Sequence, residues 1–472
     1  MTLEIKSLVL VQEALARLEE GFNSLPKFDR SINIDALRPV LLEVAERMQD
    51  NYPYPHPLYV GQMLKPPTEI ARLAYTLSLW INPNNHALDG GRASSAMEKE
   101  AVAEIAKMFG WETHLGHLTS GGTMANLEGL WVAGNLQPNK KVVASSQSHY
   151  THSRICGVLR IPFQSVPCDS RARMDVVALK KLLQEDDIGT VVVTLGTTAT
   201  GAVDPLPEIL ELQAEYGFRI HADTAYGGYF ILADNLDNEA RKAYDCLKKA
   251  DSIVVDPHKH GLQPYGCGCI IFKDPTVGKI YKHDSPYTYF SSEELHLGEI
   301  SLECSRPGSS AVALWATQRL LPLIPGGEFA GYLSKSRKAA LTLFEKLQND
   351  SRFIVAFPPE LDIVVWMVKS QSASESSRLA KEIFKAAEQE NLHLALANLP
   401  KELFLETGEG INWDQESITC LRSCLMKPEH LDWIDRIWQT LDLVTTQVLS
   451  TAVARAMDNR EAIKVMVRSS NG

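Results

Sequence analysis

The chain has 472 residues, of which 45% are apolar and 22% are charged, so it has the composition of a globular protein with a sizeable core. Its 47 Lys and Arg residues are outnumbered by 58 Asp and Glu residues, and no dense basic run is present, which argues against a nucleic-acid partner. No apolar run reaches bilayer length and the N-terminus shows no small-residue cleavage pattern, so we expect a cytoplasmic protein with no membrane partner. The eight cysteines form no C-x-x-C pair, so we expect reduced thiols and no metal site.

The first 50 residues carry apolar side chains at helical spacing twice, which predicts two helices. The two stripes consist of Leu8, Val11, Leu15 and Leu18, and of Leu37, Leu41, Val44 and Met48. The next stretch, NYPYPHPLYVGQMLKPP (51–67), is rich in proline and predicts an extended path. Such a path can line a channel, wrap around a second subunit or act as a simple linker. We assign residues 1–85 to an N-terminal helical and extended dimerisation segment.

A longer helix is expected to begin near Met97, with Ser94 or Ser95 as its cap. The polar residues 84–91 before it are rich in asparagine and glycine. They are either the rim of an active site or a turn.

Short β-branched runs alternate with helical patterns from about Leu115 onward. Strands are predicted at 142–144, 191–193, 219–222 and 253–255, and helices between them at 176–183 and 206–216. This alternation predicts the α/β class with a mainly parallel sheet, and ligands then belong at the carboxyl ends of the strands. We assign 86–325 to this large domain and 326–472 to a smaller C-terminal α/β domain. In the smaller domain we expect helices at 333–348, 377–390 and 430–457, and strands at 363–368 and 419–425.

Polar and small residues follow each of the predicted strands. The stretch HLTSGGTMANLEGLW (117–131) opens a helix with Ser120, Gly121, Gly122 and Thr123, which is either a phosphate cradle or a plain glycine turn. It has neither G-x-G-x-x-G nor P-loop spacing, which argues against a dinucleotide or a triphosphate.

The next two strand ends carry histidine and threonine. His149, in SSQSHYTHSRICG, can stack on a flat ring or act as an acid or base, although both it and His152 can also be surface residues. Thr197 and Thr198, in VTLGTTATG, can bond a phenolic or carboxylate oxygen or simply form a turn.

The last two strand ends carry an acid and an amine. Asp223, in RIHADTAYGG, can pair with a protonated ring nitrogen, with the small Ala225 against the ring face, or it can be a turn residue. Lys259, in VDPHKHG, follows a buried strand, where desolvation favours a free amine that can form a Schiff base with an aldehyde cofactor. A solvated loop lysine is the alternative for Lys259 taken alone, but chance rarely supplies the whole set of motifs.

Four motifs together, TSGGTMAN, SHYTHS, HADTAYGG and VDPHKHG, resemble the pyridoxal-phosphate decarboxylases of the aromatic amino acid, glutamate and tyrosine decarboxylase family. The resemblance covers roughly residues 52–428. It implies the aspartate-aminotransferase-like fold (fold type I), pyridoxal 5'-phosphate (PLP) as cofactor, and a homodimer with its active sites at the subunit interface.

The resemblance also implies roles for single residues. Lys259 would form the Schiff base, Asp223 would pair with the pyridine nitrogen, and His149 would stack on the ring. The residues expected to hold the phosphate and the rest of the cofactor are Ser120, Gly121, Gly122, Thr123, Thr197, Ala225 and His258. The residues expected at the substrate are Arg422, in LRSCLMKP, which would meet its carboxylate, together with His56 and His86. Arg306 matches an arginine of the family and is equally well explained by a structural ion pair.

A catalytic tyrosine on a loop after the lysine strand is the remaining family feature. Tyr289 is our choice for it, Tyr287 is the alternative, and the adjacent Phe290 makes the register important because relatives with phenylalanine there release an aldehyde oxidatively. Thr224 and Pro307 depart from the family pattern and weaken the transfer of substrate identity.

The expected reaction is decarboxylation of an L-amino acid, with an aromatic one such as tyrosine as the first candidate. An acidic substrate would need a further cation, for which Arg92, Arg154 and Lys65 are available. Oxidative aldehyde synthesis, carbon–carbon lysis, transamination and a non-catalytic PLP-binding role stay open as alternatives.

Overall fold

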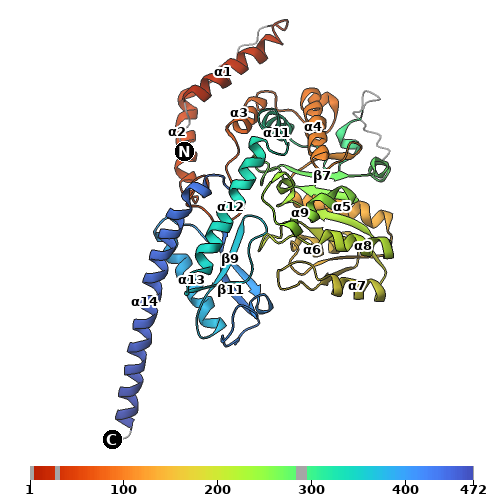
Figure 1. The fold of residues 1–472 in the computed structure, drawn as a ribbon. Coiled ribbons are helices and arrows are strands. Elements are labelled where there is room, and N and C mark those ends of the chain that lie inside the picture. Colours follow the sequence, from red (N-terminus) through yellow and green to blue (C-terminus); the bar gives the residue numbers. More distant parts are fainter. Residues whose placement is uncertain (1–4, 27–31, 283–294, 471–472) are drawn as a thin grey trace.

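The computed structural model describes residues 5–26, 32–282 and 295–470 (Figure 1). Within these ranges, no helix combines the length and the apolarity that crossing a membrane requires.

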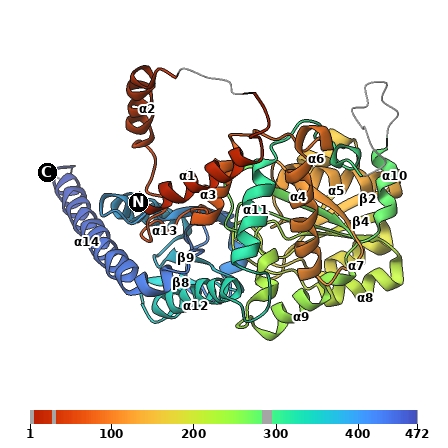
Figure 2. The same ribbon diagram turned by 90° about the horizontal axis from the view of Figure 1, so that it is seen from above.

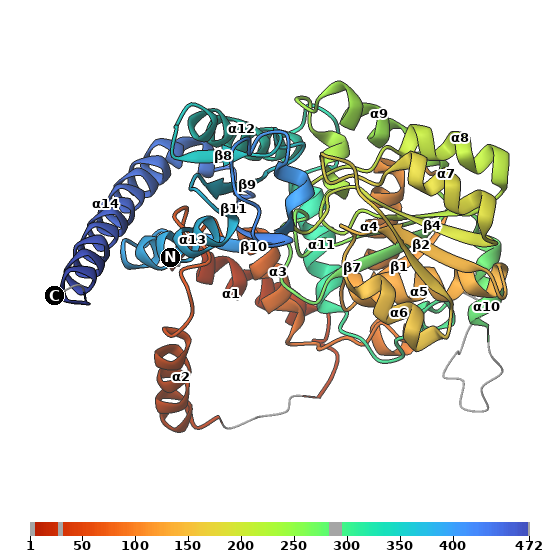
Figure 3. The ribbon, with the colours of Figure 1, turned by 90° about the horizontal axis from the view of Figure 1, so that it is seen from below.

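The N-terminal segment contains the two predicted helices and one more. They are α1 (Ile5–Glu20), α2 (Ile34–Met48) and α3 (Glu69–Ser78). Asn33 caps α2 by accepting the N–H of Ala36, which is why the helix begins there. No residue of α2 is buried, and the helix stands apart from the rest of the chain in two views (Figures 2 and 3). Its apolar stripe is therefore exposed in the single chain.

The large domain is built around one sheet, whose strands in the described chain follow the order β1-β7-β6-β5-β4-β2-β3. The strands are β1 (Leu115–Thr119), β2 (Lys141–Ser145), β3 (Phe163–Val166), β4 (Ile188–Thr194), β5 (Arg219–Asp223), β6 (Ser252–Val255) and β7 (Gly268–Phe272). The predicted strands β2, β4, β5 and β6 are confirmed and pair in parallel, whereas β7 is antiparallel to both of its neighbours. The carboxyl ends of the parallel strands therefore meet at one edge of the sheet.

Helices cover both faces of this sheet (Figure 3). The helices of the large domain are α4 (Leu88–Met108), α5 (Gly122–Leu136), α6 (Thr151–Leu159), α7 (Val176–Glu185), α8 (Leu206–Tyr216), α9 (Asn238–Cys246), α10 (Gly278–Tyr281) and α11 (Ser309–Leu320). The predicted start of a helix near Met97 is wrong, because α4 already begins at Leu88 and continues through a kink at Gly91. Ser94 and Ser95 lie buried inside it and do not cap it.

The small domain packs its helices against an antiparallel sheet of order β10-β11-β9-β8. Its elements are α12 (Glu328–Gln348), β8 (Phe353–Val355), β9 (Ile363–Val368), α13 (Ala373–Gln389), β10 (Ala395–Pro400), β11 (Ser417–Cys424) and α14 (His430–Ser470). The predicted strands at 363–368 and 419–425 are confirmed as β9 and β11. The C-terminal part of α14 extends away from the body of the chain (Figure 1).

Candidate active site

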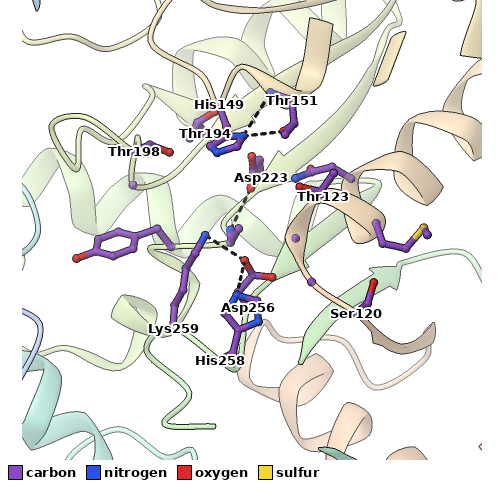
Figure 4. A pocket seen from close by; sticks show the side chains of 17 residues that line it. Ser120, Thr123, His149, Thr151, Thr194, Thr198, Asp223, Asp256, His258 and Lys259 are labelled. Atoms are coloured by element: carbon purple, nitrogen blue, oxygen red, sulfur yellow. Dashed lines mark hydrogen bonds and ion pairs between the residues drawn. The ribbon is translucent and has the colours of Figure 1, made fainter. Parts of the chain in front are cut away.

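A cavity of about 300 Å³ opens at the carboxyl edge of the large sheet, beside the start of α5 (Figure 4). Most of the predicted cofactor residues line it. They are Ser120, Gly121, Gly122, Thr123, His149, Asp223, Ala225, His258 and Lys259. With Thr194, Gly196 and Thr198 included, the lining residues come from five segments that are far apart in the sequence.

The turn between β1 and α5 lines one side of the cavity. A Cβ atom on Gly122 would lie 2.6 Å from Oδ2 of Asp256, so only glycine allows this close approach. Because α5 begins at Gly122, its first backbone N–H groups have no partner within the helix and attract an anion. The N–H of Ser120 donates to the carboxylate of Glu303 at 2.8 Å.

Asp223 ends β5 with its side chain almost fully buried. Its Oδ2 lies 2.8 Å from Nε2 of His152 on α6, and its Oδ1 accepts the N–H of Ala225 at 3.1 Å. Burial by itself would raise the pKa of Asp223, but the hydrogen bond and charge of His152 outweigh burial and lower it. The carboxylate therefore stays ionised and faces the cavity.

Lys259 extends into the cavity from the loop after β6, toward the region of Asp223 (Figure 4). Its Nζ lies 3.0 Å from Oδ2 of Asp256, and its side chain is 20% exposed. The neighbouring His258 has its Nε2 3.5 Å from the same carboxylate oxygen. Burial lowers the pKa of His258, which favours its neutral form.

His149 lies beside Thr151 and Thr194 in Figure 4, next to the start of α6. Its Nδ1 is 2.7 Å from Oγ1 of Thr151, which fixes the orientation of the ring. Burial lowers the pKa of His149, so the ring is a neutral, flat surface at the cavity wall.

Thr197 and Arg422 do not line the cavity in the described chain. The Thr197 hydroxyl lies 2.8 Å from that of Thr200 and accepts the N–H of Ala202, so it holds the turn together, and Thr198 lines the cavity in its place. The guanidinium of Arg422 donates to the carbonyls of Thr198 and Ala199 and to the side chain of Gln62. Arg422 thus supports the threonine turn from behind.

Three other predicted positions lie elsewhere. His56 is on the surface against Trp433, and His86 packs beside Gly298. Arg306 forms a buried ion pair with Glu98, which is the structural alternative that the sequence left open. Tyr287, Tyr289 and Phe290 lie outside the described residues.

Sequence reasoning missed several residues that line or support the cavity. Asp256 was available in the D-P-H-K motif as the residue three before the lysine, and His152 as the residue three after His149. Their importance follows from distances that only the fold creates. Further lining residues that were not predicted are Met124, Asn126, Thr151, Thr194, Gly196 and Tyr226.

The donors of the cavity fit a phosphorylated pyridine aldehyde. The helix start accepts a phosphate, the ionised Asp223 suits a protonated ring nitrogen, and Lys259 supplies an amine within the same space. Fold and donor set together define a fold-type I enzyme of PLP.

Comparison with known sequences identifies the family. The family described as "Pyridoxal-dependent decarboxylase conserved domain" matches residues 62–369, so the chain belongs to the pyridoxal-dependent decarboxylases. It is 27% identical over 450 residues to the L-tyrosine decarboxylase of Enterococcus faecium, covering 72% of this chain and 74% of the relative. It is also 27% identical over 317 residues to the L-aspartate/L-glutamate decarboxylase of Pyrococcus horikoshii, covering 66% and 79%. The matching part spans 63% of a further relative, the L-tyrosine decarboxylase of Levilactobacillus brevis.

Solved structures agree with this family. Oryza sativa TDC with PLP and tryptamine matches with a TM-score of 0.75 at 16% identity, covering 95% of this chain and 99% of that one. Mouse CSAD matches with a TM-score of 0.75 at 17% identity, covering 92% and 91%. These likenesses establish the fold. With the family, they make the protein a PLP-dependent carboxy-lyase that acts on an amino acid.

Proposed function

We propose that this enzyme converts an aromatic L-amino acid, with L-tyrosine as the first candidate, to the amine and carbon dioxide. The observation that carries the proposal is the convergence of Lys259, Asp223 and the Gly122 turn on one cavity. Relatives named L-tyrosine decarboxylase support tyrosine as the substrate.

The charge of the cavity also favours a substrate without a second carboxylate. Among its described lining residues, Lys259 is the one lysine or arginine. Burial lowers the pKa of both His149 and His258, so neither supplies a permanent cation. Of the three cations available in the sequence for an acidic substrate, Arg92, Arg154 and Lys65, none lines this cavity.

Each residue then has a defined task. The bound cofactor supplies an electron sink for the pair released when the bond between the substrate Cα and its carboxylate breaks. Lys259 would hold the cofactor covalently, and Asp223, kept ionised by His152, would keep a proton on its ring nitrogen. His149 would stack on the cofactor ring, and the small Ala225 would leave room for it.

The phosphate is assigned to the start of α5, with Ser120, Gly121, Gly122, Thr123 and His258 around it. Tyr289 stays our candidate for the proton donor to Cα, with Tyr287 as the alternative. Arg422 is reassigned from the substrate carboxylate to the support of the Thr198 turn, because all its described bonds go to protein oxygens.

We also propose a cytoplasmic homodimer. The exposed apolar stripe of α2 supports a second copy as its partner, and eight free cysteines support a reducing compartment. We also propose the segment boundaries 1–85, 86–325 and 326–472 that the sequence predicts.

A product screen tests the reaction. Purified enzyme with added PLP is incubated with each of the twenty common L-amino acids and with 2,4-diaminobutyrate, while amines, carbon dioxide and peroxide are measured. We expect tyramine and carbon dioxide from tyrosine, without peroxide. Consumption of aspartate or glutamate with tyrosine untouched would refute the aromatic substrate, and an aldehyde with peroxide would refute simple decarboxylation.

A further inference from the structure

The small domain inserts three consecutive residues, Glu360, Leu361 and Asp362, into the large domain immediately before β9. All three are buried, with 4%, 0% and 0% of their surface exposed. We call this segment the 360–362 plug. It contacts the loops that follow three strands of the large sheet, and each of those loops also lines the active-site cavity.

The loop after β4 receives the first two residues of the plug. Glu360 accepts the N–H of Val203 at 2.6 Å through one carboxylate oxygen, and an N–H of Arg171 at 2.7 Å through the other. A Cβ on Gly196 would lie 3.0 Å from Cδ1 of Leu361, so the Leu361 side chain packs against the backbone of Gly196. Gly196 lines the cavity, which places Leu361 directly behind the cavity wall.

The loops after β5 and β6 receive the third residue. The hydroxyl of Tyr226 donates to Oδ1 of Asp362 at 2.6 Å, and Nε2 of His260 lies 3.2 Å from Oδ2. Tyr226 itself lines the cavity and comes three residues after Asp223. His260 is the residue next to Lys259 and is fully buried between Tyr226 and Phe230, whose rings lie 4.8 and 5.0 Å from it.

The charge of Asp362 is fixed by the same contacts. Burial favours the neutral acid, but the contact with His260, the hydrogen bond from Tyr226 and the charge of Lys65 together outweigh burial and lower the pKa of Asp362. A buried anion whose partners come from two loops holds those loops at a fixed spacing, because losing either contact leaves a charge uncompensated in the interior.

We propose that the 360–362 plug is a positioning element through which the small domain sets the placement of Lys259 and Tyr226 in the cavity. Asp362 and His260 are its positioning residues. The inference rests on the proposed function in one respect, namely that Lys259 is the residue that holds the cofactor. His260 then acts on Lys259 through the backbone that they share.

The test compares two alanine variants on the same stretch of chain. Asp362→Ala removes the contact to the large domain, whereas Val364→Ala, two residues along β9, removes buried volume from the separate core of the small domain. Both variants should lower thermal stability. Asp362→Asn, which keeps an acceptor for Tyr226, serves if the alanine variant fails to fold.

The readouts separate positioning from stability. In Asp362→Ala we expect kcat to fall on the order of 100-fold, as for a misplaced reacting group, with a smaller change in KM. We also expect faster release of PLP from the holoenzyme. In a pH titration of the visible absorbance of the lysine-bound cofactor, we expect the midpoint to shift to lower pH, because the variant lacks an anion near the lysine loop. Val364→Ala should keep the wild-type midpoint and release rate, and Asp362→Asn should restore part of kcat.

Two outcomes would overturn the inference, and a third would strike the proposed function instead. If Asp362→Ala keeps the wild-type midpoint and kcat, or matches Val364→Ala in every readout, the plug is merely structural. If Lys259→Ala retains the visible absorbance of the bound cofactor, Lys259 is not the residue that holds the cofactor. The proposed role of Lys259 would then be wrong, whatever the result for Asp362→Ala.

Discussion

His152 on α6 keeps the carboxylate of Asp223 ionised, because its hydrogen bond and charge lower the pKa of Asp223. The two side chains are buried, and their bond is 2.8 Å long.

Motif spacing identified Asp223, Lys259 and the glycine turn, because each follows a recognisable strand. It could not identify His152, Asp256 or Tyr226 as part of the site, because their roles depend on distances between loops. The same limit explains why Thr197 and Arg422 were predicted at the cavity but do not line it. Both have suitable chemistry, but both are hydrogen-bonded to neighbouring protein atoms.

Replacing His152 should make the enzyme sensitive to acid. His152 lowers the pKa of Asp223 against the effect of burial, so in His152→Ala the folded-state pKa of Asp223 rises. Activity then falls as pH decreases through this raised value, whereas the wild type keeps Asp223 ionised. We expect the acid limb of the kcat/KM profile to move to higher pH, with a loss in kcat of about 10²-fold or more at that limb.

Two control variants define this experiment. Ser153→Ala, on the exposed face of α6, should leave the profile unchanged. His152→Gln keeps a side-chain donor and should recover part of the loss. An unchanged acid limb in His152→Ala would contradict the role of the pair.

At the scale of elements, the start of α5 depends on the missing side chain of Gly122. In Gly122→Ala the new Cβ would press on the Asp256 carboxylate, which also contacts Lys259. We expect PLP affinity to fall about 10-fold to 100-fold, a loss of about 1.4 to 2.8 kcal/mol, measured by fluorescence titration of the apoenzyme.

Gly157→Ala is the matched control, since a Cβ there meets nothing within 4 Å and the residue lies inside α6. This variant should bind PLP normally and gain up to about 1 kcal/mol of stability. Equal PLP affinity in both variants would show that the α5 turn does not hold the phosphate.

Asp204, in the loop between β4 and α8, should lower the free energy of unfolding as pH rises from about 4 to about 7. It accepts the N–H groups of Thr194 and Met174, yet burial raises its pKa to about 7. The same group ionises near pH 3.9 when unfolded, so its contribution to stability is full below about pH 4 and is lost as pH rises through about 7. Urea unfolding at pH 5 and 8 should show a smaller pH-dependent loss for Asp204→Asn than for the wild type. An equal loss in both proteins would assign the effect to other groups.

The elements predicted best are those with buried β-branched runs, such as β4 and β6, because a parallel strand is apolar on both faces. The start of α4 was misplaced because Ser94 and Ser95 have the chemistry of caps, and only packing shows that they lie inside the helix. The antiparallel direction of β7 was not predicted, since apolar runs carry no information about strand direction.

For the whole molecule, the exposed stripe of α2 is the feature that a single chain leaves unexplained. Leu37 is 57% exposed and Leu41 is 70% exposed, and no residue of the helix is buried. An amphipathic helix without a partner is marginal in water, so its stripe needs a surface to bury it. We expect sedimentation equilibrium to give twice the chain mass of 52.4 kDa at micromolar concentration.

Two variants of α2 test whether this stripe forms the dimer contact. Leu37→Glu combined with Leu41→Glu places charges on the stripe and should shift the enzyme to monomers, with a loss of turnover if the site lies at the interface. Glu46→Lys changes the charge of the same helix off the stripe and should stay dimeric. If the double variant remains dimeric and active, the dimer interface lies on another surface. Glutamates buried at a two-fold interface would face their symmetry mates and repel them strongly.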